Sequence, residues 1–348
     1  MLTFVPLLTS LLALGFAVAL VDQWRERRHT FQLVWAAGMT FFGIAAGCEA
    51  IAAATRWSEL LYRTWYLTGA VSTAGWLGLG TAFLLNRTRF GYAFALTLFL
   101  GGLFAFLTQR KENYADVGAL PIIYFIAATV LGLAVAIETY FQNERWPRIA
   151  AVGVVGATIA AGVMMAGVTL PSPGYALSPT TGQPIASLFP GTLRLLTPFL
   201  NVTGGIGLFL GALFSTYVFM PKRRILTYSL DPDQTGDQFL FNLMISPVAL
   251  TVNFVASIPG AVQALVTGRL HSRVPSTLLI AIGAIVASAG DTLSRFGITA
   301  PFAIAKLIAV IFLLAGFLIS IEVFREFRIP FTKIRLGVAR RERSAGSH

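Results

Sequence analysis

Long apolar stretches alternate with short polar connections along almost the whole chain. A helix rises 1.5 Å per residue, so about 20 apolar residues cross the hydrocarbon core of a bilayer. The pattern predicts an all-α integral membrane protein. We expect nine membrane-crossing helices: Leu2–Val21, Phe31–Ala54, Leu61–Leu85, Phe90–Thr108, Gly118–Phe141, Ile149–Leu170, Leu195–Met220, Pro275–Gly290 and Thr299–Phe324.

A tenth apolar stretch, Phe239–Gly268, is interrupted along its length. Pro247 and Pro259 each remove a backbone donor that a continuous helix would use, and polar residues are spread between them. Irregular backbone at membrane depth is tolerated only where protein or a water-lined cavity covers it. We therefore expect a broken re-entrant or interfacial hairpin rather than a tenth crossing.

The distribution of Lys and Arg favours the same solution. If the tenth stretch does not cross and the N-terminus is outside, 19 basic residues are cytoplasmic and six are external. With ten crossings, the better orientation places 14 inside and 11 outside. Because basic residues concentrate in cytoplasmic loops, we predict nine crossings, an external N-terminus and a cytoplasmic C-terminus. The alternative is ten crossings with both termini inside.

This topology divides the chain into four parts. Residues 1–220 form a seven-helix bundle, 221–238 a cytoplasmic loop, 239–324 the hairpin plus two crossings, and 325–348 a basic cytoplasmic tail. A long uncharged connection, Pro171–Arg194, predicts an ordered external loop or lid.

Composition excludes several classes of protein. With 56% hydrophobic and 12% charged residues, the chain is not a soluble globular protein. We assign the net charge of +11 to the cytoplasmic membrane surface and expect no nucleic-acid partner. One cysteine, Cys48, and three histidines outside the membrane centre exclude a disulfide framework, bis-His haem and a His-rich metal cage. We therefore expect neither a cofactor nor a metal.

The tail after the last crossing alternates basic with apolar residues. This pattern is typical of a segment that lies on anionic lipid headgroups, although an ordinary positive-inside signal explains most of the charge. The residues expected to face the lipid are Arg325, Arg328, Lys333 and Arg335.

Charged residues inside crossings are the strongest candidates for a site, since each costs several kcal/mol in hydrocarbon. Glu49 and Lys306 both lie about 7 to 11 Å below the external surface. Asp291 ends the neighbouring crossing on the same side. Because opposite charges at one depth are more stable together than apart, we predict that Lys306 pairs with Glu49 or Asp291. These three residues define a candidate outward-facing ligand or ion pocket, with a purely structural pair as the alternative.

Two further features adjoin this region. Thr197 and Asn201 flank Pro198 just below the external loop, so their polar groups can meet the carbonyl that the proline frees or contact a ligand. Glycines spaced as GxxxG occur at Gly43 and Gly47 and at Gly207 and Gly211. Such small-residue stripes predict close helix packing, within the chain in preference to a dimer interface.

The cytoplasmic loop from Asp231 to Asp237 resembles half of a calcium-binding loop, but Asn242 stands where the bidentate glutamate belongs. We expect turns here, with Asp237 capping a helix that begins at Gln238. We find no motif of a hydrolase, zinc protease or nucleotide-binding enzyme, so no catalytic residue is predicted.

Together these features favour a plasma-membrane transporter or channel over a membrane enzyme. The alternative is a non-catalytic sensor or structural subunit that binds another membrane protein or a second copy of itself.

Overall fold

The structure is a computed structural model that describes residues 3–112, 114–179, 182–295 and 300–319, together with two short strands at 327–328 and 335–336. Side chains are described outside 288–302 and outside those strands. The long helices are α1 (Phe4–Arg27), α2 (Thr30–Ala54), α4 (Thr73–Leu84), α5 (Gly91–Glu112), α6 (Leu120–Tyr140), α7 (Trp146–Gly167), α9 (Leu196–Phe219), α11 (Phe239–Val266), α12 (Arg273–Arg295) and α13 (Ala300–Ile319). Shorter elements are α3 (Glu59–Trp65), η1 (Tyr66–Ser72), η2 (Ala186–Leu188), α8 (Gly191–Arg194), α10 (Pro232–Thr235), η3 (Gly236–Gln238), β1 (Phe327–Arg328) and β2 (Arg335–Leu336).

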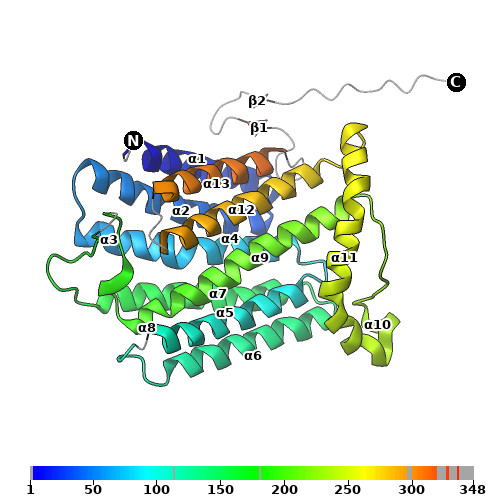
Figure 1. Cartoon of the computed structure of the whole chain (residues 1–348), viewed down its shortest axis with the longest axis horizontal. Coiled ribbons are helices and arrows are strands. Elements are labelled where there is room, and N and C mark those ends of the chain that lie inside the picture. Colours follow the sequence, from blue (N-terminus) through cyan, green and yellow to red (C-terminus); the bar gives the residue numbers. More distant parts are fainter. Residues whose placement is uncertain are drawn as a thin grey trace.

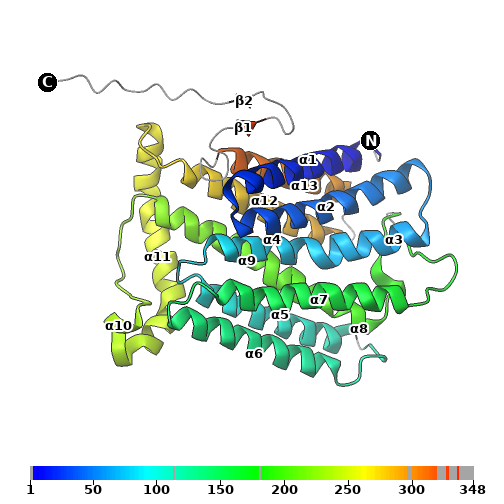
Figure 2. The ribbon, with the colours of Figure 1, turned by 180° about the vertical axis from the view of Figure 1, so that it is seen from behind.

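Most long helices lie side by side in one bundle, whereas α11 runs crosswise over one end of it (Figures 1 and 2). We call this end the α11 end. The opposite end carries α3 and the long connection 168–190, and we call it the loop end. Short connections join antiparallel neighbours, as in α1 with α2, α5 with α6, and α12 with α13.

Helix α9 is the centre of the bundle. It packs against α4, α5 and α12, and it contributes to both large hydrophobic clusters. One cluster fills the space between α9 and the helices from α3 to α7; the other lies between α9, α1, α2, α12 and α13. Many apolar side chains on the outer faces remain exposed, and α6 alone presents Ile122, Ile126, Val130 and Leu133. Exposed apolar faces around a packed bundle are what lipid contact requires.

The apolar helices indicate a multi-pass membrane protein. Among the described residues, eight helices are long and apolar enough to cross a bilayer, and this set includes α11 but neither α12 nor α13. The described apolar parts of α12 and α13, Arg273–Ala287 and Ala303–Ile319, are shorter. All nine predicted stretches correspond to helices, although residues 320–324 of the last stretch lie outside the described residues.

The predicted third crossing is one helical segment, Glu59–Leu84, with a π-helical stretch inside it. Ser58 caps its start by accepting a hydrogen bond from the amide of Leu61. Ser72, the last residue of the π-helical stretch, and Thr73, the first of α4, donate their hydroxyls to the carbonyls of residues five positions earlier, at 2.7 and 2.8 Å. These bonds help satisfy carbonyls in the widened turn, a feature that is frequent at functional sites.

Small residues allow the close helix contacts that the glycine stripes predicted, and these contacts lie within the chain. A Cβ on Gly204 of α9 would meet the Ala74 carbonyl oxygen at 2.0 Å, and one on Gly43 would meet Leu14 of α1 at 2.7 Å. A Cβ on Gly211 would meet Thr81 of α4 at 2.3 Å. The glycines therefore set the spacing between α9 and α4 and between α2 and α1.

The predicted hairpin over Phe239–Gly268 is wrong, because α11 is one continuous helix of 28 residues with Pro247 and Pro259 inside it. Pro247 cannot donate to the carbonyl of Leu243, but the hydroxyl of Ser246 donates to that carbonyl at 2.9 Å. The freed group is thus satisfied without a break. The helix begins at Phe239 after Gln238 with no side-chain cap, so the predicted capping by Asp237 is also wrong.

The polar residues of α11 attach it to the extended segment 221–231, which we call the strap. Asn253 is 1% exposed; its Oδ1 accepts the amides of Ile225 and Leu226 at 2.7 and 2.9 Å, and its Nδ2 donates to the Leu226 carbonyl at 2.8 Å. Ser257 accepts the amide of Arg223 at 2.8 Å. The strap runs alongside α11 (Figures 1 and 2).

Candidate functional site

An ion pair joins α2 to α13 near the loop end of the bundle. Lys306 Nζ lies 2.5 Å from Glu49 Oε1, and the two side chains are 17% and 14% exposed. The indole Nε1 of Trp65 in α3 donates to the same oxygen at 2.9 Å. The structure therefore brings together two of the residues that the sequence singled out, and it adds Trp65.

The geometry explains why both charges are tolerated in an apolar bundle. Each would carry a large desolvation cost alone, and Coulomb attraction together with charge-assisted hydrogen bonds offsets that cost when they are joined. The two side chains are mostly shielded, at 17% and 14% exposed. The site therefore contains one cationic group, the Lys306 ammonium, and one anionic group, the Glu49 carboxylate, in direct contact.

Aromatic rings connect this pair to α9 and to the long connection. Trp65 lies between Tyr62 and Tyr66, with ring centroids 6.0 and 6.2 Å away, and Phe189 stacks on both tyrosines at 4.8 and 4.3 Å. The hydroxyl of Tyr66 shares a 2.8 Å hydrogen bond with Thr197 Oγ1. Thr197 thus belongs to the same cluster of contacts as the ion pair. Asn201 lies one turn further along α9 and is partly exposed.

The connection 168–190 is fastened to α3 by two side chains, as expected of an ordered loop. The Arg63 guanidinium donates to the carbonyls of Met165 and, at 2.5 Å, Val168, and it also pairs with Glu59 at 2.5 Å. Tyr62 donates its hydroxyl to the carbonyl of Ile185. Short helical elements, η2 and α8, complete the connection before α9.

Replacing Arg63 with alanine should release this loop. Two partly buried charge-assisted bonds are lost, one to Met165 near the end of α7 and one to Val168 at the start of the connection, at a cost of roughly 2 to 3 kcal/mol. Amide hydrogen exchange across 168–190 should therefore accelerate by at least tenfold. Arg56→Ala is the matched control, because Arg56 lies exposed at the same end. Equal exchange in the two variants would show that Arg63 does not hold the loop.

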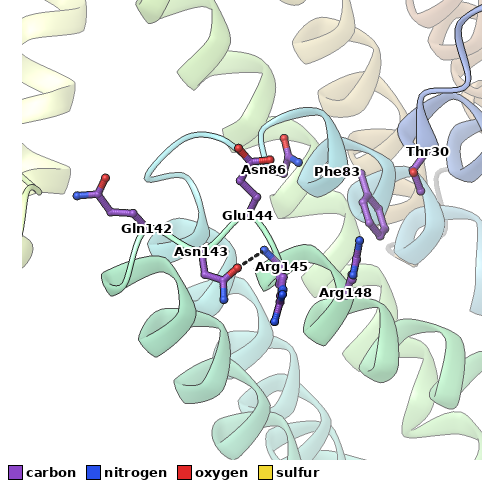
Figure 3. Close-up of a pocket in the computed structure, with 8 residues that line it drawn as sticks. All are labelled: Thr30, Phe83, Asn86, Gln142, Asn143, Glu144, Arg145 and Arg148. Atoms are coloured by element: carbon purple, nitrogen blue, oxygen red, sulfur yellow. Dashed lines mark hydrogen bonds between the residues drawn. The ribbon is translucent and has the colours of Figure 1, made fainter.

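A cavity of about 490 Å³ lies at the α11 end, far from the ion pair (Figure 3). It is lined by Thr30, Phe83, Asn86, Gln142, Asn143, Glu144, Arg145 and Arg148. Its carboxylate, Glu144, pairs with Arg87 at 3.2 Å, so the two lining guanidiniums give the cavity a positive character. This cavity was not predictable from the sequence, because the α6–α7 connection, Asn86 after α4 and the ends of α2, α4 and α7 form it together.

Several predicted positions fall outside the described part of the chain. The backbone of Asp291 lies in α12, but its side chain is not among those described. Arg325 and Lys333 lie outside the described residues, and Arg328 and Arg335 are described only as backbone partners in the β1–β2 pair. The pairing of Lys306 with Asp291 and the lipid contact of the tail therefore stay predictions.

The acidic loop before α11 has a structural role. Asp231 caps α10 by accepting the amide of Asp233 and pairs with Arg89 at 3.3 Å. Within the described residues, no group of three or more His, Cys, Asp or Glu side chains has a metal-binding arrangement.

No protein-family model matches the chain, and neither a curated protein nor a solved structure shows significant similarity to it.

Proposed function

We propose that nine helical segments of this protein cross the plasma membrane and that α11 does not. Phe239 begins α11 beside Tyr92 at the start of α5 and Tyr140 at the end of α6, with ring centroids 5.7 and 5.1 Å away. After α11, His271 stacks on Phe219 at the end of α9, at 4.9 Å. Both ends of α11 thus meet the same end of the bundle. The excess of basic residues at this end supports a cytoplasmic α11 end and an external loop end.

Within this topology, we propose that the protein transports a small polar or charged solute across the membrane. The ion pair of Glu49 and Lys306 is the observation that carries the proposal. It lies below the external surface, beside a π-helical turn and under a fastened loop, and it joins helices distant in sequence. A solute that carries a charge can replace either partner, so opening and closing of the pair supplies an outward gate.

Transport can be measured on protein reconstituted in vesicles, by recording charge displacement after concentration jumps. The probes are alkali cations, inorganic phosphate and the common amino acids. Glu49→Gln and Lys306→Met should each lower the wild-type current by more than about tenfold, because each leaves one charge without its partner. Glu112→Gln is the matched control, since it removes a more exposed carboxylate, one that pairs with Arg194 at 3.9 Å.

The double variant Glu49→Gln/Lys306→Met separates a gate from a structural pair. It removes both charges together, so its thermal unfolding midpoint should return close to that of the wild type. If the pair is the transport site, the current of the double variant should remain as low as that of the single variants. A double variant that regains full current, or a wild-type protein that moves none of the probes, would overturn the proposal.

A further inference from the structure

Helix α11 presents three different faces. Leu250, Phe254 and Ala261 pack beneath the ends of α9 and α12. Asn253 and Ser257 bind the strap, as described above. The third face is apolar and uncovered: Phe241, Met244, Val248, Val255, Val262 and Val266 are 66, 81, 58, 57, 54 and 82% exposed.

The exposed apolar residues form one face along the whole helix. Leu240, Ile258 and Leu265 are also exposed, at 70, 43 and 60%, and with them the face spans a sector of about 120° at 3.6 residues per turn. This face, which we call the stripe, lies on the side of α11 that is turned away from the strap-binding residues. Helix α11 contains no charged residue. An apolar stripe of this length marks a surface that binds lipid or protein.

Charge and position favour lipid as the occupant. The strap exposes Lys222, Arg223 and Arg224 on the side of α11 opposite the apolar stripe, and the exposed Arg269 follows the helix. The helix runs crosswise to the bundle at the level where the other helices end (Figures 1 and 2). Tyr140, a residue of the type that concentrates at membrane interfaces, lies at this level and is 41% exposed. An apolar face with basic residues on the opposite side fits an anionic leaflet.

We infer that α11 is an in-plane membrane anchor, with its apolar stripe among the acyl chains of the cytoplasmic leaflet and the basic strap on anionic headgroups. This inference rests on the proposed topology but not on transport. The strap supplies the polar face that the sequence of α11 itself lacks. Strap and helix together make the amphipathic unit.

Spin labels on single cysteines test the position of α11. On a Cys48→Ala background, labels at Met244, Val255 and Val262 are compared with one at Ile126, an exposed position within α6, and one at Lys222 in the strap. The vesicles contain phosphatidylcholine and phosphatidylglycerol. The three stripe labels should collide with oxygen more often than with a water-soluble nickel complex, and all three should report the same shallow depth in the membrane. The label at Ile126 should report a deep position, and the label at Lys222 should be accessible from water.

Three outcomes would overturn the inference. Stripe labels that are open to the nickel complex would place α11 in water. A depth that increases from Met244 to Val255 and then decreases towards Val262, reaching that of Ile126, would make α11 a crossing. Labels immobilised and closed to both reagents would show that a second copy or another protein covers the stripe. Because the readout is depth, a failure here is distinguishable from a loss of solute current.

Native mass spectrometry tests the headgroup contact. Lys222→Gln/Arg223→Gln/Arg224→Gln should reduce the preference for phosphatidylglycerol over phosphatidylcholine by about fivefold per removed charge. Arg110→Gln/Lys111→Gln, which removes exposed charges at the loop end, should leave it unchanged. An unchanged preference in the triple variant would overturn the assignment of anionic headgroups to the strap.

Discussion

Gly204→Ala is expected to destabilise the bundle by roughly 3 kcal/mol, in spite of the gain in helix propensity of about 1 kcal/mol. The new Cβ would stand 2.0 Å from the Ala74 carbonyl oxygen and 2.5 Å from the Gly75 Cα. These are backbone atoms of the α3–α4 segment, so no side chain can rotate away, and α9 and this segment must separate. The expected result is a lower thermal unfolding midpoint and a smaller monodisperse peak in size-exclusion chromatography.

The adjacent glycine provides the control. A Cβ on Gly205 meets nothing within 4 Å, so Gly205→Ala should leave the midpoint unchanged or raise it through helix propensity. Both variants change glycine to alanine in the same turn of α9, which cancels the propensity term. Equal midpoints would contradict the close approach of α9 to the α3–α4 segment.

This contrast also shows what a sequence pattern can predict about helix packing. Small residues at regular spacing predict that a helix approaches a neighbour closely, and Gly43 and Gly211 do so. The pattern does not name the neighbour, because spacing is a property of one helix. That Gly43 packs on Leu14 and Gly211 on Thr81 depends on how all the helices are arranged.

The ion pair was predictable for a different reason. The depth of a residue below the membrane surface follows from counting residues along its helix. Because each charge alone bears a large desolvation cost, two opposite charges at the same depth are more stable as an ion pair. The contribution of Trp65 was not predictable, because the direction of its indole depends on how α3 is placed beside α2. The cavity near Arg145 and Arg148 was not predictable for a similar reason, since segments that are distant in sequence form it.

The break predicted in α11 shows where local rules fail. Proline removes a helix hydrogen bond, but it ends a helix only when the freed carbonyl finds no other donor. Ser246 supplies that donor for Leu243. The predicted placement at the cytoplasmic face rests on charge counts over the whole chain, whereas at Pro247 a single hydroxyl satisfies the freed carbonyl.

Asn253→Ala is expected to release the strap from α11. The substitution removes three hydrogen bonds to the strap backbone and leaves the amides of Ile225 and Leu226 without their acceptor, at a cost of about 3 kcal/mol. Hydrogen exchange at these two amides should accelerate by about 100-fold, since 1.4 kcal/mol corresponds to a factor of ten. Trypsin should also cleave more readily after Lys222, Arg223 and Arg224.

Gln263→Ala is the matched control, because Gln263 is an exposed amide side chain on the same helix. Its removal should leave exchange in the strap unchanged. Asn253→Asp refines the test: it keeps an acceptor for both amides but loses the donor to the Leu226 carbonyl, so its protection should fall between those of the wild type and the alanine variant. If the Ile225 and Leu226 amides stay protected in Asn253→Ala, the strap is held by its other contacts, and the buried asparagine is not what joins it to α11.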